Sequence, residues 1–206
     1  MRFEHQVMAE IAEHGPMRFS QFVEAALYDA DFGFYTTSGR AGGRRGDFVT
    51  SVEVGPLFAA VLADWLDGVW RALGEPAVFR VCEAGAGVGT LFRGINRAAP
   101  ACFAALTYTL VERSAVLRVA HQSLPGEAWR SAAVLPKEHQ HVVMANELLD
   151  NLSFDIAERV TNGWAFVDVG ADSGRLGLQA GPADRELDHL SDLAPDANSG
   201  TRVPVA

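Results

Sequence analysis

Val81–Leu91 reads VCEAGAGVGTL and determines the fold expected for this chain. An apolar run ends at Cys82, three glycines follow at positions 85, 87 and 89, and helical spacing begins at Thr90. A glycine-rich connection between a buried strand and a helix lets a ligand approach the backbone closely. The stretch therefore predicts an α/β fold with a ligand site at the carboxyl end of this strand.

The rest of the 206-residue chain supports that prediction, because strands alternate with helices. This order predicts a parallel sheet with right-handed crossovers. The expected strands cover residues 78–82, 106–112, 129–134 and 141–146, and the expected helices cover 90–97 and 116–123. A hairpin is expected over residues 156–180, with Asn162-Gly163 as its turn. The prediction is thus an incomplete sheet of about four parallel strands, followed by a hairpin.

The N-terminal part has helical spacing instead. A first helix is expected to end before Gly15-Pro16, and Ser20 suits the N-cap of a second one. A third helix begins at Pro56, and its broad apolar face predicts a core position. We expect residues 1–75 to form a helical region with a glycine-rich loop, and residues 76–206 to form the partial α/β domain.

The spacing of the three glycines bears on the ligand. A dinucleotide fingerprint is G-x-G-x-x-G, but here the third glycine comes one residue early, at Gly89, and Thr90 follows. Glu83 stands two positions before Gly85, where a carboxylate suits the ammonium group of S-adenosylmethionine and would repel a pyrophosphate. The early third glycine at Gly89, the threonine at position 90 and the acid at Glu83 favour S-adenosylmethionine over NAD. A tight turn that binds no ligand is the alternative.

Polar residues also follow two other expected strands. Glu112 ends the second one, where a carboxylate accepts hydrogen bonds from ribose hydroxyls, although a solvated strand end explains it equally. Asn146 and Glu147 end the fourth strand, and Asp150 follows. An amide there suits a substrate or cofactor, and carboxylates suit a cationic acceptor such as a guanidinium. The alternative is that Asn146 only caps the following segment.

The long loop before the third helix contains GDFVTSVE at residues 46–53. Asp47, Thr50 and Ser51 are candidates for contact with a cofactor. Thr50 and Glu53 have the spacing of a capping box, so local structure alone also explains them. Asp47 follows two arginines, and an ion pair with them is the alternative for that residue.

Composition excludes several classes of function. The net charge of −9 argues against a general binder of nucleic acid or of anionic membranes. No apolar run approaches the roughly 20 residues needed to span a bilayer. The N-terminus also lacks the features of a targeting peptide, so we expect a cytoplasmic protein. Neither the two cysteines, Cys82 and Cys102, nor the six histidines have metal-ligand spacing, so no metal is expected.

Five blocks of sequence resemble the MidA family in order and spacing. They read ALYDADFGFYT, GDFVTSVEVGPLF, FRVCEAGAGVGTL, YTLVERS and ANELLDNLSFD, within residues 7–170. This family contains predicted S-adenosylmethionine-dependent methyltransferases, including the mitochondrial complex I assembly factor that methylates a protein arginine. The resemblance implies a Rossmann-like class I methyltransferase core, preceded by a helical N-terminal region.

The resemblance also implies roles for individual residues. The cofactor would be bound by Glu83, Gly85, Gly87, Gly89 and Glu112, with Asp47, Thr50 and Ser51 near it, while Asn146, Glu147 and Asp150 would face the acceptor. Ala86 departs from the proline that family members commonly have after the first glycine. Family members are also considerably longer. The resemblance therefore implies further sheet strands that these 206 residues do not supply.

The leading hypothesis is an S-adenosylmethionine-dependent methyltransferase, with a protein arginine as the acceptor that the resemblance implies. A second hypothesis is an inactive S-adenosylmethionine-binding or assembly module, and a weaker third is an NAD-binding Rossmann enzyme. The expected partners are a protein substrate and either a second copy or a complementing chain that completes the sheet.

Overall fold

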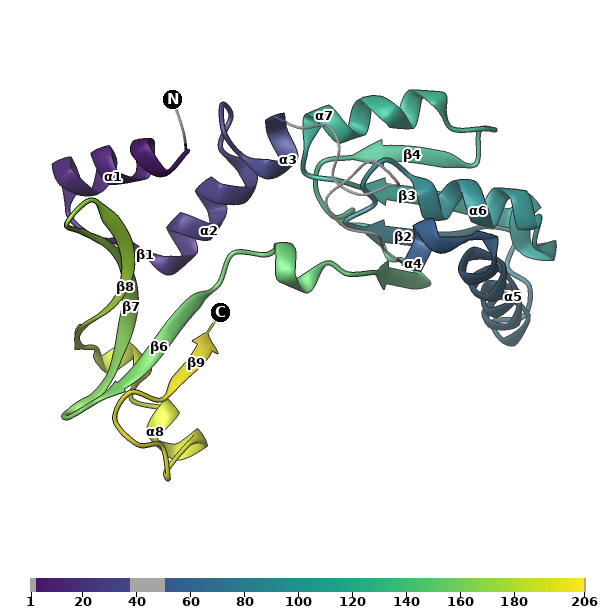
Figure 1. Ribbon diagram of the computed structural model, residues 1–206. Helices are drawn as coiled ribbons and strands as arrows, with labels where there is room; N and C mark the ends of the chain where they lie inside the picture. Colours follow the sequence, from purple (N-terminus) through teal and green to yellow (C-terminus); the bar gives the residue numbers. More distant parts are fainter. Residues whose placement is uncertain (1–2, 38–50, 206) are drawn as a thin grey trace. The chain divides into compact units, whose positions relative to one another are not determined.

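The computed structural model describes residues 3–37 and 51–205, apart from the side chain of Glu53 (Figure 1). The chain divides into two compact units. We call residues 1–33 and 150–206 the first unit, and residues 34–149 the second unit. The boundary expected after residue 75 thus lies inside the second unit. No helix among the described residues has the length and hydropathy that crossing a bilayer requires.

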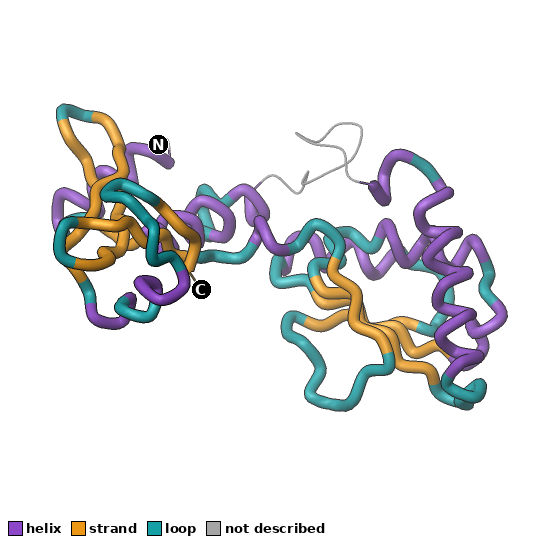
Figure 2. The backbone as a smooth tube through the Cα atoms, turned by 90° about the horizontal axis from the view of Figure 1, so that it is seen from below, coloured by secondary structure: helices purple, strands orange, loops and turns teal. Residues whose placement is uncertain are grey.

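The second unit contains a four-stranded parallel sheet. Its strands are β2 (Phe79–Ala84), β3 (Leu106–Val111), β4 (Trp129–Ala132) and β5 (Val142–Ala145). They are hydrogen-bonded in the order β4-β3-β2-β5, and every neighbouring pair is parallel. Figure 2 shows these strands side by side in one layer. The predicted number, order along the chain and direction of the strands are confirmed.

Helices and short helical turns make up most of the rest of the second unit. They are α3 (Phe34–Thr37), α4 (Ser51–Val54), α5 (Pro56–Ala72), α6 (Thr90–Ala98), α7 (Ala115–Arg118) and the 3-10 turns η1 (Ala101–Ala105) and η2 (Val119–Ser123). Buried residues of α5 and α6 form one core cluster with alternate residues of β2 and β3, among them Leu66, Phe92 and Val81. Gly94 of α6 lies directly against the Ala59 side chain of α5, so glycine permits the close approach of the two helices.

The broad apolar face of α5 is only partly core, contrary to expectation. Ala59 and Ala63 are buried, whereas Leu57, Val61 and Trp65 are exposed by 75%, 58% and 48%. The close approach to α6 explains this difference, because only small side chains fit where two helix backbones nearly touch. Leu57, Val61 and Trp65 therefore lie away from α6, whereas Leu66 is fully buried in the core.

The first unit is an antiparallel sheet with helices from both ends of the sequence. It contains α1 (Phe3–His14), β1 (Met17–Arg18), α2 (Phe19–Tyr28), β6 (Asp155–Val160), β7 (Gly163–Asp172), β8 (Arg175–Ala183), η4 (Arg185–Leu187), α8 (Leu190–Leu193) and β9 (Arg202–Val205), and η3 (Leu149–Asn151) leads into it. The strand order is β1-β7-β6-β9, and β8 also pairs with β7. Val7 and Ile11 of α1 pack with Val169 of β7, so residues far apart in sequence share this core.

Two local predictions in this unit need correction. Val160 pairs with Gly163, so the two-residue turn is Thr161-Asn162 and Gly163 already belongs to β7. The N-cap of α2 is Arg18, because Gln21 accepts a hydrogen bond from the Arg18 N–H at 3.1 Å. Ser20 lies inside the helix instead, and its N–H donates to the Asp155 carboxylate at 2.9 Å.

Candidate functional site

A glycine loop joins β2 to α6 at the carboxyl edge of the parallel sheet. Gly85, Gly87 and Gly89 have φ values of +73°, +54° and +79°, the left-handed region that side chains disfavour. The N–H groups of Gly85 and Ala86 both donate to the Val111 carbonyl, at 2.9 and 3.0 Å. The loop is therefore fixed to the end of β3.

The three glycines differ in what surrounds them. A Cβ atom at Gly85 would lie 2.8 Å from Leu148, and one at Gly89 would lie 3.0–3.1 Å from Leu124 and Leu110. At Gly87 no atom of residues 3–37 or 51–205 lies within 4 Å of that position. Gly85 and Gly89 are thus needed for packing within the chain, whereas the backbone at Gly87 is open to a ligand.

Glu112 follows β3 and holds the glycine loop from one side. Its side chain accepts hydrogen bonds from the Gly87 N–H at 2.9 Å and from the Ser114 N–H at 2.7 Å. The residue is only 8% exposed. An ionised carboxylate has about four acceptor sites, and these two bonds leave capacity for further donors.

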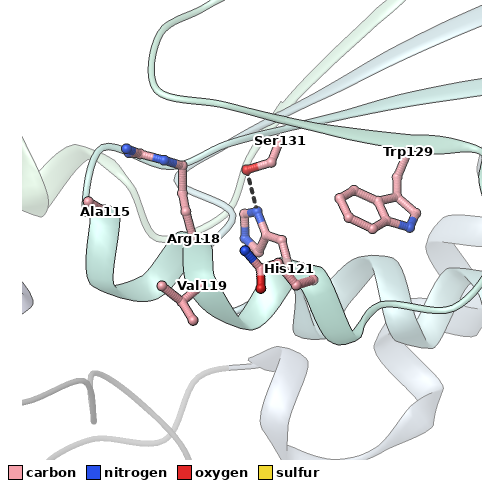
Figure 3. A pocket seen from close by; sticks show the side chains of 7 residues that line it. Ala115, Arg118, Val119, His121, Trp129 and Ser131 are labelled. Atoms are coloured by element: carbon pink, nitrogen blue, oxygen red, sulfur yellow. Dashed lines mark hydrogen bonds between the residues drawn. The ribbon is translucent and has the colours of Figure 1, made fainter.

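His121 of η2 holds the same glycine from the other side. Its Nε2 lies 2.9 Å from the Gly87 carbonyl oxygen, and its Nδ1 lies 2.8 Å from Ser131 Oγ on β4 (Figure 3). Burial lowers the pKa of His121 below its usual value, which favours the neutral ring. Because a carbonyl only accepts, Nε2 carries the proton and Nδ1 accepts from Ser131. Sequence reasoning missed His121, since an isolated histidine in a helix gives no signal.

His121 also lines a cavity of about 270 Å³ between the segment after β3 and β4. The lining residues are Ala115, Arg118, Val119, His121, Gln122, Trp129 and Ser131, most of which Figure 3 labels. None of them is among the residues that the sequence predicted for the site.

Glu83 lies in β2 directly before the glycine loop, and it is almost completely buried. It is 5% exposed, and its Oε2 accepts a hydrogen bond from the Tyr108 hydroxyl at 2.8 Å. Burial raises the pKa of Glu83, the Tyr108 hydrogen bond lowers it and the charge of Glu112 raises it, giving a pKa of about 7. A carboxyl group poised near neutrality at a ligand-binding edge is typical of functional sites.

The carboxyl end of β5 brings two further predicted residues to this edge. Asn146 is partly buried and Glu147 is exposed. Glu147 has a φ of +51°, an uncommon conformation for a residue other than glycine and one found often at functional sites. Both the N–H and the hydroxyl of Ser51 donate to Glu147 Oε1 at 3.3 Å. The structure therefore brings Ser51 and Glu147 together.

The remaining predicted residues are placed elsewhere or not described. Asp150 is exposed and begins the C-terminal part of the first unit. Asp47 and Thr50 lie outside the described residues. Cys82 and Cys102 are both buried free thiols. Among residues 3–37 and 51–205, no three histidine, cysteine or acidic side chains come together in a way that would hold a metal ion.

Comparison with known proteins gives a family and a solved relative. Residues 61–205 match the family described as "Putative S-adenosyl-L-methionine-dependent methyltransferase". A crystal structure of a COG1565 superfamily member from Burkholderia thailandensis, bound to S-adenosyl-homocysteine, is 30% identical with a TM-score of 0.83. The match covers 98% of this chain and 55% of that one.

Curated relatives carry the name protein arginine methyltransferase NDUFAF7, mitochondrial. The Drosophila melanogaster homolog is 34% identical over 90 residues, which are 44% of this chain and 20% of the relative. The Mus musculus protein is 26% identical over 197 residues, covering 79% of this chain and 44% of the relative. The chain thus spans about half the length of the Mus musculus relative and of the Burkholderia thailandensis structure.

Proposed function

The chain belongs to the MidA-like family of S-adenosyl-L-methionine-dependent methyltransferases, and from this premise we propose that the edge around Gly87 holds the cofactor. The fold is the Rossmann-like methyltransferase fold that the sequence predicted, and the cofactor of the family is S-adenosylmethionine. The space that the described residues leave open beside Gly87, in a loop whose other glycines are packed, is the observation that carries this proposal.

Each predicted residue has a role in this proposal. Glu83 binds the ammonium group of the cofactor, since a buried carboxylate needs a cationic partner to remain ionised. Glu112 accepts hydrogen bonds from the ribose hydroxyls with the acceptor sites that its contacts with Gly87 and Ser114 leave open. Ser51, which contacts Glu147, contributes from the segment before α5, and Asp47 and Thr50 remain predictions from the sequence, since they lie outside the described residues.

We also propose a methyl acceptor of cationic, guanidinium type. The bound cofactor supplies an electrophilic methyl group, and the protein contributes mainly by aligning the acceptor with it. Asn146 and Glu147 provide amide and carboxylate oxygens that suit a guanidinium, and Asp150 remains a prediction from the sequence for the same role. The names of the arginine methyltransferase relatives support a protein arginine as the substrate. Their names also mention mitochondria, and a cytoplasmic location remains our prediction from the sequence.

A partner polypeptide completes the parallel sheet in this proposal. Among the described residues β5 pairs only with β2, and Val143 of β5 is 60% exposed. An unpaired parallel edge with exposed apolar side chains is normally covered. Because the relatives are about twice as long, we propose polypeptide equivalent to their remaining part as the covering element. A second candidate function, an inactive binding or assembly module, rests on the same open edge.

A thermal-shift comparison tests the cofactor. S-Adenosylmethionine and S-adenosylhomocysteine are expected to raise the melting temperature of the purified chain, because both bind only the folded state. NAD is expected to have no effect, since Glu83 would repel its pyrophosphate. A shift with NAD alone would favour the dinucleotide enzyme, and no shift with any of the three would contradict the proposal.

Two glycine variants test the position of the site within the loop. Gly87→Ala is expected to fold, at a cost of about 1–2 kcal/mol for its left-handed backbone, and to lose S-adenosylhomocysteine binding. Gly89→Ala carries the same backbone cost and also crowds Leu124 and Leu110, so its main effect is on stability. Calorimetric titration of both folded variants separates the two effects. Unchanged affinity in Gly87→Ala would contradict the proposed approach of the cofactor.

A further inference from the structure

We propose that Tyr108 is a positioning residue, whose hydroxyl orients the Glu83 carboxylate toward the ammonium group of the cofactor. This inference rests on the proposed function, in which Glu83 makes that contact. Nothing in the sequence pattern distinguishes Tyr108 from the other alternating residues of β3, and its role emerges only from the contact between the two strands.

The contact is fixed by the register of β2 and β3. Tyr108 pairs with Val81 and Leu110 pairs with Glu83, so Tyr108 lies one step diagonally from Glu83 on the same face of the sheet. Its hydroxyl donates to Glu83 Oε2 at 2.8 Å. The ring is fully buried and packs against Phe92 of α6, with the ring centroids 5.0 Å apart. The packing of the ring on Phe92 and the hydrogen bond to Glu83 together fix the position of the hydroxyl.

The surroundings of Glu83 make this one hydrogen bond important. From β3, the groups that alter its pKa are the Tyr108 hydroxyl, which lowers it, and the carboxylate of Glu112, which raises it. Toward β5 its strand partner is the apolar Met144, and Phe92 of α6 packs against the ring of its partner Tyr108. Cys82 precedes Glu83 on β2, and its own pKa is raised first by burial and then by the Glu83 charge.

Tyr108 therefore affects the pH range over which the site binds a cation. A phenol that donates to a carboxylate stabilises the ionised form, since hydrogen bonds to charged acceptors are stronger than those to neutral ones. With a pKa of about 7, Glu83 is only partly ionised at neutral pH in the absence of ligand. Affinity for an ammonium ligand then follows the ionised fraction and rises as the pH increases through 7.

The test is the pH profile of S-adenosylhomocysteine affinity for the full chain, measured by calorimetry between pH 6 and 8.5. The variant Tyr108→Phe keeps the ring that packs against Phe92 and removes only the hydroxyl. The affinity of this variant for S-adenosylhomocysteine is expected to be roughly tenfold lower than that of the wild type at pH 7 and about twofold lower at pH 8.5. A merely structural role for Tyr108 would lower affinity equally at every pH, and such a result would overturn the inference.

A control variant and an alternative substitution at position 108 complete this experiment. Tyr28→Phe is the matched control, because it removes a hydroxyl that donates to the Asn151 carbonyl in the first unit, and it should leave the profile unchanged. If Tyr108→Phe fails to fold, 3-fluorotyrosine at position 108 tests the same contact. Its more acidic hydroxyl is a stronger donor, so the rise in affinity should move to lower pH, and an unmoved profile would overturn the inference.

Glu83→Gln separates this inference from the proposed function. It is expected to bind S-adenosylhomocysteine weakly and without dependence on pH in this range. Wild-type affinity in Glu83→Gln would contradict the proposed role of Glu83 itself. Weak binding by Glu83→Gln, together with a wild-type profile in Tyr108→Phe, would overturn only the role of Tyr108.

Discussion

The two sheets of this chain differ in the kind of side chain that their strands bring together. In the second unit the strands are parallel, and buried carboxyl groups and strained backbone gather where they end, at Glu83, Glu112 and Glu147. In the first unit the strands are antiparallel and surround apolar clusters, one of them centred on Trp164. None of the residues proposed to bind the cofactor lies in that unit.

This difference follows from topology. Parallel strands all end at the same edge of a sheet, so successive loops bring polar groups into one place. Antiparallel strands end alternately at opposite edges, and their hairpins do not concentrate side chains in this way. The comparison indicates that the parallel sheet carries the ligand chemistry, while the antiparallel sheet has a core of its own.

The largest expected effect concerns the independence of the two cores. Trp164→Ala should destabilise the first unit by about 3–5 kcal/mol, because it removes a fully buried aromatic side chain. Hydrogen exchange should then show lost protection in β6 and β7, while β2 and β3 keep theirs. Trp65→Ala, on the exposed face of α5, is the control and should change stability by less than about 0.5 kcal/mol. Equal loss of protection in both sheets would contradict two separate cores.

A second prediction concerns the effect of the buried Glu83 carboxyl on the free energy of unfolding. The pKa of Glu83 is raised in the folded state, so its neutral form is favoured and stability is lost as the pH rises from about 4.5 to about 7. Without cofactor, Glu83→Gln should therefore be more stable than the wild type at pH 8 by up to about 3 kcal/mol, and nearly equal at pH 4. Urea unfolding at both pH values measures this, and a difference that does not depend on pH would contradict it.

The smallest expected effect concerns the helices that cover the parallel sheet. Gly94→Ala should destabilise the second unit by about 2 kcal/mol, because the new methyl group meets Ala59 of α5. Gly68→Ala is the matched control: it lies within α5, no atom of the described part of the chain would lie within 4 Å of its methyl group, and it should stabilise by up to about 1 kcal/mol. Thermal unfolding compares the two variants. Equal effects would show that the two helices do not approach as closely as described.

Local sequence signals predicted the second unit well. The loop at residues 81–91, the four parallel strands and α6 were all predicted, because glycines, apolar runs and helical spacing are short-range features. The carboxyl-edge positions of Glu112 and Glu147 followed from the ends of the strands. Their roles toward a cofactor and an acceptor remain proposals.

Longer-range features escaped prediction for physical reasons. The packing of α1 against β7 joins residues about 160 positions apart in the sequence, and no periodicity encodes such a pairing. The exposed face of α5 was mistaken for core, since apolar periodicity does not show which of two faces is covered. The contacts of His121 with the glycine loop and of Tyr108 with Glu83 emerged only from the structure, because their spacing in sequence resembles that of ordinary buried residues.

Hydrogen–deuterium exchange of the full chain, with and without S-adenosylhomocysteine, tests the central claim most directly. We expect the ligand to slow exchange at residues 83–91 and 110–114, where the glycine loop and the end of β3 meet. Exchange in residues 155–205 should not change, because the antiparallel sheet contributes none of the proposed cofactor contacts. Protection confined to residues 155–205, or none in residues 83–91 at a saturating ligand concentration, would contradict the assignment of the cofactor to the parallel sheet.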